Sequence, residues 1–231
     1  MKKLLLLLSI ILVASCAKDN TNFILKGNIK GLKKGTVYLQ KMKDSNVVTL
    51  DFKKIDGDSD FELSTNLESP QMLFLKLERN DGASGQLSFF AAEGMMELNT
   101  SLKNFYVDAK VTGSKQQTVL EEYKAMMTKF NDKNLDYIKE NLEAEMKNDT
   151  AKLSASYDSY EKLLRRKYLY TINFAVNNKD SEVAPYVAVT EIRDANIKFL
   201  DTIYNALTKD VQSSKYGKEL KFLIDKRKKE K

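Results

Sequence analysis

The chain of 231 residues contains no histidine and no tryptophan, and its only cysteine is Cys16. Without histidine, a Ser-His-Asp triad, a Cys-His dyad and a histidine-ligated zinc site are excluded. Because a second cysteine is lacking, internal disulfides and a dithiol redox site are excluded too. We therefore predict a protein that has no catalytic residues, no metal and no cofactor and is stabilised by packing. An enzyme that uses carboxylates or tyrosine is the remaining alternative.

Residues 1–15 have the pattern of a signal peptide. Lys2 and Lys3 form a positive segment, and an apolar stretch over 4–13 is interrupted only by Ser9. About ten apolar residues are too few to span a bilayer, which takes about 20, but they suit a signal-peptide core. Removing Lys2 and Lys3 lowers the formal net charge from +6 to +4. So small an excess does not indicate a nucleic-acid partner.

The residues that lead into the cysteine, Val13-Ala14-Ser15-Cys16, resemble the lipobox of bacterial lipoproteins. The resemblance implies cleavage between Ser15 and Cys16, followed by attachment of a diacylglyceryl group to the thiol and of an acyl chain such as palmitate to the new amino terminus. Two or more acyl chains anchor a protein stably to a membrane. An ordinary signal peptide with an incidental cysteine nearby is the alternative.

The residues after Cys16 bear on location. Ala17 takes the position at which an aspartate retains many lipoproteins in the inner membrane, so an outer-membrane lipoprotein is favoured. Lys18-Asp19-Asn20 partly resembles the acidic signals that send some lipoproteins to the cell surface, and both the periplasmic face and the surface stay open. Residues 16–22 are a lipidated tether in this interpretation. Since residues 17–22 extend only about 20 Å, the folded part is expected close to the membrane.

Residues 23–113 alternate between apolar and polar with a period of two, which predicts an antiparallel β-sandwich or open barrel. No helical segment interrupts them, so a parallel sheet is not expected. Val48, Leu50 and Phe52 are expected on one face of a strand, and Phe105 to Val111 is expected to be a strand throughout. The predicted strands cover residues 23–30, 37–39, 48–53, 61–63, 73–77, 87–92, 95–100 and 105–111.

The segment Asp56-Gly57-Asp58-Ser59-Asp60 places acids where the first, third and fifth ligands of a calcium loop would lie. The sixth position is Phe61 in place of glycine, and the twelfth is Leu67 in place of a bidentate glutamate. We therefore predict a hairpin turn, in which Asp-Gly supplies the residues with positive φ.

Residues 114–231 switch to a helical period, and the predicted fold is α+β. Ser114 is the expected N-cap of a first long helix. A break over 148–150 separates it from a second, so that the pair forms an antiparallel hairpin. Shorter helices are expected after Ser181, with Pro185 near the first turn, over 197–207, and after Ser214. The stripes expected to pack are Val119, Tyr123, Met126, Met127, Phe130, Leu135, Ile138, Leu142 and Met146 in the first helix, and Leu153, Tyr157, Tyr160, Leu164, Tyr168, Ile172 and Ala175 in the second.

Three groups of residues are candidates for binding, each with a simpler interpretation. Tyr157, Tyr160 and Tyr168 either line a ligand groove or pack as one helix face. Residues 165–167, Arg-Arg-Lys, either meet phosphate or lipid headgroups or form a solvated face. The basic tail over 226–231 either touches anionic membrane or ends a helix in a way that favours the helix dipole. The simpler interpretation is preferred in each case.

Five segments, taken in order, resemble the thiol:disulfide interchange lipoproteins of Gram-negative bacteria. In that family a β-rich domain of unknown function and a helical segment precede a thioredoxin-like domain with a Cys-x-x-Cys pair. The sequence here ends at Lys231, before the thioredoxin-like domain would begin, so we do not expect that domain. The matching segments are FILKG at 23–27, DFEL at 60–63, VTGS at 111–114, DSEVAPY at 180–186 and SKYGKEL at 214–220.

The expected function follows from location and from the missing redox pair. We expect a lipid-anchored, non-catalytic module of the cell envelope that presents a β-domain (23–113) and a helical domain (114–231) to an envelope redox protein, a peptide or a glycan. The alternative is an accessory to a periplasmic thiol-disulfide oxidoreductase, or a truncated remnant of one.

Overall fold

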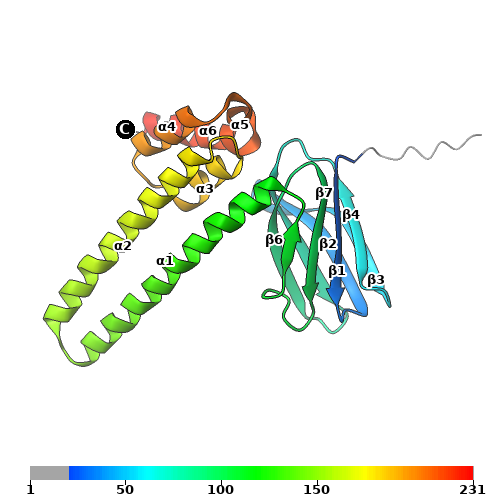
Figure 1. Cartoon of the computed structure of the whole chain (residues 1–231), viewed down its shortest axis with the longest axis horizontal. Helices are drawn as coiled ribbons and strands as arrows, with labels where there is room; N and C mark the ends of the chain where they lie inside the picture. Colours follow the sequence, from blue (N-terminus) through cyan, green and yellow to red (C-terminus); the bar gives the residue numbers. More distant parts are fainter. Residues whose placement is uncertain (1–20, 231) are drawn as a thin grey trace, which may run out of the picture.

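The computed structural model describes residues 21–230, in which eight strands are followed by six helices (Figure 1). The α+β prediction is confirmed. The strands are β1 (Phe23–Lys30), β2 (Lys34–Lys43), β3 (Asn46–Asp56), β4 (Asp60–Thr65), β5 (Gln71–Arg79), β6 (Ser84–Ala91), β7 (Gly94–Ser101) and β8 (Lys110–Thr112). The helices are α1 (Lys115–Met146), α2 (Thr150–Asn177), α3 (Val183–Glu191), α4 (Ile197–Ala206), α5 (Lys209–Ser213) and α6 (Lys215–Lys229).

The strands form an open sandwich of two sheets, in the orders β4-β1-β7-β8 and β3-β2-β5-β6. Alternate residues of both sheets point inward and form one apolar core, in which Phe23, Leu25, Leu75 and Phe89 are fully buried. The period-two pattern is therefore that of two sheets packed face to face, each with a solvated or helix-covered outer face.

One strand pair differs from the expected antiparallel arrangement. β1 and β7 run parallel, with Gly27 opposite Leu98, while the other strand pairs of the described residues are antiparallel. A Cβ atom on Gly27 would lie 2.0 Å from the carbonyl oxygen of Leu98, so glycine permits this close pairing. The connection from β1 to β7 runs through β4 and the opposite sheet, and no crossover helix marks it in the sequence.

The predicted strand over 105–111 is wrong for most of its length, since only Lys110–Thr112 pairs with β7. The backbone N–H groups of Val107 and Asp108 donate to the carbonyl of Asn104 and close a turn. Phe105 is buried against Gly85, and the Thr100 hydroxyl donates to its carbonyl at 2.8 Å. The apolar–polar alternation over 105–111 therefore does not mark a strand. It includes the buried ring of Phe105, which lies in a turn.

Two further β-domain predictions need correction. The Asp56–Asp60 segment turns at Gly57 (φ 99°), but it connects β3 to β4 in the opposite sheet and is not a hairpin. Phe52 lies on the outer face beside Tyr38, with ring centroids 6.1 Å apart, because a bulge shifts the register of β2 and β3 at Leu39/Gln40. Within residues 21–230 no cluster of His, Cys, Asp or Glu is placed to hold a metal ion.

The helical hairpin of α1 and α2 is confirmed, and so are two predicted caps. The Ser114 hydroxyl accepts from the backbone N–H of Gln117, and the Ser214 hydroxyl from that of Gly217. Ser181 lies one residue before the N-cap of α3, where its hydroxyl accepts from Val183 N–H, and Pro185 lies in the first turn. None of the helices in the described part of the chain is both long and apolar enough to cross a membrane.

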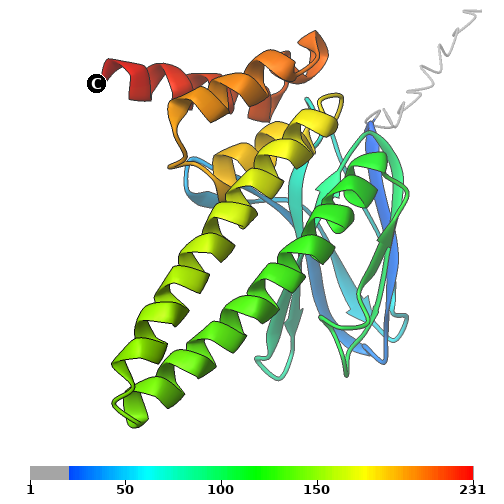
Figure 2. The same ribbon diagram turned by 60° about the vertical axis from the view of Figure 1, so that its left-hand side comes forward.

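The helical part is joined to the outer face of the β3-β2-β5-β6 sheet. Met72 and Phe90 from this sheet are buried in the helical core. The Phe90 N–H donates to Gln117 Oε1 at 2.7 Å, and the Met72 N–H donates to the Tyr216 hydroxyl at 3.1 Å. Figure 2 shows the short helices gathered at one end of α2, while the rest of the hairpin extends away from them.

The stripes predicted to pack along the hairpin are partly wrong. Leu135, Ile138, Leu142 and Met146 on α1, and Tyr157 and Tyr168 on α2, are exposed. Toward the hairpin tip the buried seam of α1 runs one position before Leu135, Ile138 and Leu142, because it continues the spacing of three and four residues set by Tyr123, Met127 and Phe130. On α2, Ser156 and Lys167 likewise lie one position before Tyr157 and Tyr168. The seam residues are Leu120, Tyr123, Met127, Phe130, Asn134, Tyr137, Asn141 and Ala144 facing Leu153, Ser156, Tyr160, Leu163, Lys167, Tyr170 and Phe174.

Candidate functional site

An open groove of about 940 Å³ runs along α2 and is closed on one side by the α3–α4 loop and the first turn of α4. Its α2 residues recur every three or four positions, which places them on the side of the helix turned away from α1. The lining residues are Asp158, Glu161, Lys162, Leu164, Arg165, Tyr168, Leu169, Ile172, Asp194, Ala195, Asn196 and Phe199.

The floor of the groove is apolar and open to solvent. Leu169 is 47% exposed and Phe199 is 43% exposed, and Tyr168 adds an aromatic face beside them. Single exposed apolar side chains are common on protein surfaces. Several of them side by side form a patch, and such a patch more often marks an interaction surface.

Charged side chains of both signs form the rim. Asp158, Glu161 and Asp194 are acidic, and Lys162 and Arg165 are basic. Among residues 21–230, neither Lys162 nor Arg165 has a carboxylate within 4.0 Å. The Arg165 guanidinium is therefore free to bind a carboxylate of a ligand through two parallel hydrogen bonds.

The loop wall of the groove is held in place by the C-terminal helix. Asn196 caps α4, accepting at its side-chain oxygen from Lys198 N–H at 3.0 Å. Arg227 of α6 donates from Nη1 to the carbonyls of Arg193 and Ala195, and Lys228 pairs with Asp201. The basic tail predicted from the sequence thus has a third role, as a brace for this loop.

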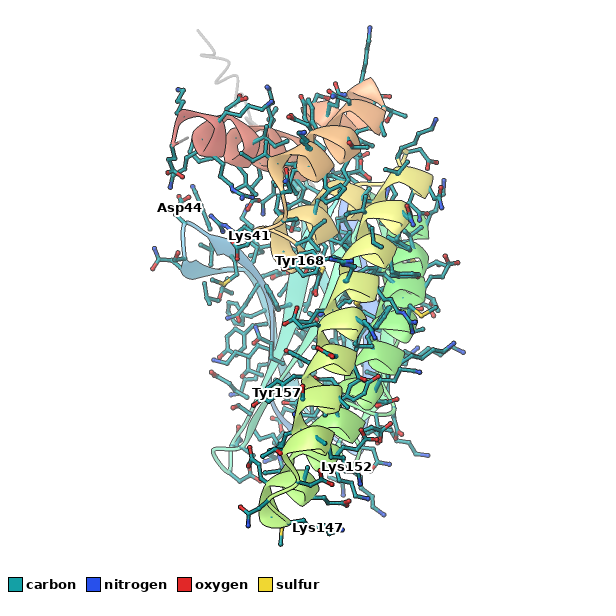
Figure 3. All side chains as sticks on the ribbon, turned by 90° about the vertical axis from the view of Figure 1, so that its left-hand side faces the viewer. Lys41, Asp44, Lys147, Lys152, Tyr157 and Tyr168 are labelled. Carbon is teal, nitrogen blue, oxygen red and sulfur yellow. The ribbon has the colours of Figure 1, made fainter. Side chains whose placement is uncertain are left out.

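The structure brings together only some of the residues singled out from the sequence. Tyr168 and Arg165 both line the groove. Tyr157 is exposed on the same side of α2 as Tyr168 but lies nearer the hairpin tip (Figure 3). Tyr160 is half-buried in the seam, and Lys167 pairs with Glu191 at 3.5 Å. Ser15 and Cys16, the predicted cleavage and lipidation residues, lie outside the described residues.

Sequence reasoning missed Phe199, Leu169 and Asp194. A signal for Phe199 was present, since it lies off the apolar face that Ile197, Leu200 and Ile203 present to the core. An exposed ring indicates an interaction surface only where other exposed apolar side chains lie beside it, as Leu169 and Tyr168 do here. The role of Asp194 depends on where the α3–α4 loop lies relative to α2, which no local pattern indicates.

A second hollow of about 470 Å³ lies on the outer face of the β4-β1-β7-β8 sheet. Its polar side chains are largely occupied with one another. Lys26 pairs with Glu62 at 3.3 Å, and Asn28 donates to Ser59 at 2.8 Å. This hollow therefore offers fewer free contacts to a ligand than the groove.

Glu182 is a carboxylate with a raised pKa, and it lies away from the groove. Burial raises the pKa of Glu182, which accepts from the Gln116 side chain, and Gln116 in turn accepts from the Ser181 hydroxyl. Beside them Lys115 pairs with Asp180 at 2.9 Å. These contacts tie the start of α1 to the start of α3, so the shift has a structural cause.

Comparison with known proteins covers the β-domain and the first turns of α1. Residues 23–120 match the model of a family described as a domain of unknown function (DUF4369). No curated protein matches the chain. The groove lies outside the matched residues.

Proposed function

We propose that the protein is a lipid-anchored, non-catalytic binding module of the cell envelope, whose groove beside α2 holds a peptide segment of a partner protein. One observation carries the proposal: an apolar floor of Leu169, Tyr168 and Phe199 lies open to solvent beside Arg165, whose cation has no carboxylate partner within residues 21–230. Apolar pockets with a few oriented polar groups on their rims are the usual form of a binding site.

The chemistry of the groove favours a peptide over a glycan. An apolar floor between charges of both signs suits a short amphipathic segment, whose apolar side chains would cover Leu169 and Phe199 while a carboxylate meets Arg165. A glycan would need many hydrogen-bonding groups on the floor, and Leu164, Ile172 and Ala195 provide none with their side chains.

Anchoring at Cys16 would hold this module close to a membrane. The Asn22 side chain is already fixed, donating to the Leu67 carbonyl at 2.8 Å and to Glu93 at 2.9 Å. The tether would then be the few residues between Cys16 and Asn22, at an outer membrane and on its periplasmic or outer face. In Figure 1 β1 begins at the end of the sandwich remote from the hairpin tip, so the tip would point away from the anchor.

The proposal is tested with peptides selected from a random phage-displayed library on the purified protein. Affinity of a selected peptide is measured by fluorescence anisotropy for the parent, for Leu169→Asp and for Phe222→Asp. Phe222 is exposed on α6 and does not line the groove, so it is the matched control. We expect Leu169→Asp to weaken binding at least about tenfold, which is about 1.4 kcal/mol, and Phe222→Asp to leave it unchanged. Equal loss in both variants, or no selected peptide, would overturn the proposal.

The alternative function is an accessory to a periplasmic thiol-disulfide oxidoreductase, or a remnant of one. Two segments that resemble that family meet at Phe90, whose ring lies 5.6 Å from Tyr186 and 5.8 Å from Tyr216. They therefore build the junction between sheet and helices, a role that a full-length redox lipoprotein would need equally. Copurification of a thioredoxin-like protein from membranes would support this alternative. Reduction of insulin by the purified chain would contradict the non-catalytic assignment.

A further inference from the structure

The two ends of the helical region carry opposite net charge. Residues 197–230, which form α4 to α6, contain nine basic and five acidic residues, a net charge of +4. Residues 132–158, which form the half of the α1–α2 hairpin near its tip, contain four basic and seven acidic residues, a net charge of −3. An anionic surface would therefore attract the short helices and repel the hairpin tip.

The positive end of the helical region lies at the same end of the molecule as the start of the β-domain. In Figures 1 and 2, which share a vertical axis, α4 to α6 and the first residues of β1 lie at the top, while the hairpin tip lies at the bottom. An anchor at Cys16, as proposed above, holds this same end close to the membrane, because residues 17–22 extend only about 20 Å. The inference below rests on that anchor for its orientation.

The outer side of α6 combines lysines with one exposed ring. Lys218, Phe222, Asp225 and Lys229 recur at intervals of four, three and four residues, so they lie on one side of the helix. The buried residues of α6 lie on its opposite side. Phe222 is 70% exposed, although it is the largest apolar side chain of this side. We call these four residues the α6 face.

The positive charge of the α6 face is not cancelled by neighbouring carboxylates. Asp225, the acidic residue of the face, is bound to Lys221 at 2.8 Å. Lys218 and Lys229 are exposed, and within residues 21–230 neither has a carboxylate within 4.0 Å. Both lysines are therefore available to the phosphates of anionic lipids.

We propose that the α6 face lies on the surface of an anionic phospholipid membrane and is a second point of attachment besides the lipid anchor. Lys218 and Lys229 contact lipid phosphates, while the ring of Phe222 between them enters the boundary between headgroups and acyl chains. An acyl anchor combined with a basic patch holds a protein more firmly than either alone. Two attachment points at one end of the molecule also fix its orientation, with the hairpin tip directed away from the membrane.

A membrane surface suits the α6 face better than an acidic protein does. The face is one side of a single helix, and its residues line neither the groove nor the hollow on the β-sheet. It therefore offers no concave site for a peptide, of the kind that binding sites usually have. A lipid surface adapts to a convex helix that carries lysines around one ring. The face is also separate from the groove, so peptide binding does not depend on it.

Tryptophan fluorescence tests the proposal, because the chain contains no tryptophan and an introduced one reports on its own position. The mature chain from Cys16 is coupled through its thiol to a maleimide lipid in vesicles, which supplies the tether independently of acylation in cells. Phe222→Trp is compared with Tyr157→Trp, an aromatic site toward the hairpin tip that is 58% exposed (Figure 3). Brominated phosphatidylglycerol in the vesicles should quench Phe222→Trp at least about twofold and leave Tyr157→Trp unchanged.

Brominated phosphatidylcholine alone should quench neither variant, because it carries no net charge. Equal quenching of the two variants by brominated phosphatidylglycerol would overturn the proposal, and so would equal quenching of Phe222→Trp by the two lipids. Soluble polyglutamate is the probe for an acidic protein. If polyglutamate shifts the Phe222→Trp emission while the anionic vesicles leave it unquenched, the α6 face binds an acidic protein and the proposal is wrong.

Charge reversal tests the role of the lysines in the Phe222→Trp chain. Lys218→Glu combined with Lys229→Glu should abolish quenching by brominated phosphatidylglycerol. Lys147→Glu combined with Lys152→Glu, at the hairpin tip (Figure 3), changes the net charge by the same amount and should leave the quenching intact. Circular dichroism verifies that both variants are folded. Equal loss of quenching in both would show that net charge acts without the α6 face, and it would contradict the proposal.

Discussion

Arg227 donates a hydrogen bond from Nη1 to the carbonyl oxygen of Ala195 at 2.7 Å, and in this way α6 fixes the loop that closes the groove. The same nitrogen reaches the Arg193 carbonyl at 2.9 Å. A groove wall made of loop backbone depends on such a brace, because its own carbonyls have no helical partner. The position of the wall is therefore controlled from a residue that does not line the groove.

Replacement of this brace should weaken both folding and binding. We expect Arg227→Ala to lower the free energy of unfolding by about 1–2 kcal/mol and to weaken binding of a selected peptide severalfold. Urea denaturation and anisotropy titration measure the two effects. Lys226→Ala is the control, since Lys226 makes only an exposed pair with Glu230 at 3.9 Å. A peptide affinity unaffected by Arg227→Ala would show that the loop wall is not part of the site.

The pH dependence of stability should reveal the buried carboxyl of Glu182. Burial raises its pKa above the ordinary 4.5, so the protonated form favours the folded state. That contribution is present below about pH 4.5 and is lost as pH rises through the raised pKa. Glu182→Gln should therefore stabilise the protein at pH 8 and have little effect at pH 4, as measured by urea denaturation.

Asp180 supplies a control of opposite sign. Its hydrogen bond with Lys115 lowers the pKa of Asp180 below 3.8, so its contribution is present above that pH and is lost as pH falls. Asp180→Asn should destabilise the protein slightly at pH 8, and this effect should shrink as the pH falls through the lowered pKa. If both variants shift stability in the same direction at pH 8, the assigned causes of these pKa shifts are wrong.

Gly27 should be the least replaceable glycine of the β-domain. A Cβ atom there would lie 2.0 Å from Leu98 O and 2.5 Å from the Phe61 ring, so Gly27→Ala should cost about 3 kcal/mol or prevent folding. Gly82→Ala is the comparison, because that site is open and only its φ of 86° opposes a side chain, at a cost of about 1 kcal/mol. Equal melting temperatures for the two variants would contradict the parallel pairing of β1 with β7.

The membrane anchor can be tested at Cys16 alone. Cys16→Ala should move the protein from the membrane fraction to the soluble fraction or leave it unprocessed, since the acyl chains would have no attachment point. Fractionation of cells followed by immunoblotting and intact mass measurement shows which. If the variant stays membrane-bound and is still processed, the lipoprotein interpretation is wrong.

Local patterns were sufficient for much of the fold. The alternation in 23–30 and 73–77, the N-caps Ser114 and Ser214, and the break near 148–150 each depend on neighbouring residues, and each prediction is confirmed. The parallel pairing of β1 with β7 depends on partners about 70 positions apart, which no local pattern encodes. Residues 105–109 show the opposite case: their apolar–polar alternation predicts a strand, but they form a turn.

The candidate site was less accessible to sequence reasoning. Hydrophobicity favoured Leu135, Ile138 and Leu142 for the hairpin seam, but the helix phase set by Tyr123 and Phe130 places Asn134 and Asn141 there. Which of two adjacent faces of a helix is buried depends on how the partner helix packs against it. The sequence gives no sign that Tyr168 and Arg165 act together, and only the position of the α3–α4 loop shows that they line the same groove.

The most direct test of the binding module is a methyl NMR titration of the protein with a selected peptide. We expect the methyl signals of Leu164, Leu169 and Ile172 to shift and to saturate at the affinity found by anisotropy, while those of Leu73 and Leu75 in the sandwich core stay unchanged. Saturating peptide that leaves the three groove residues unshifted, or that shifts the sandwich core instead, would contradict it.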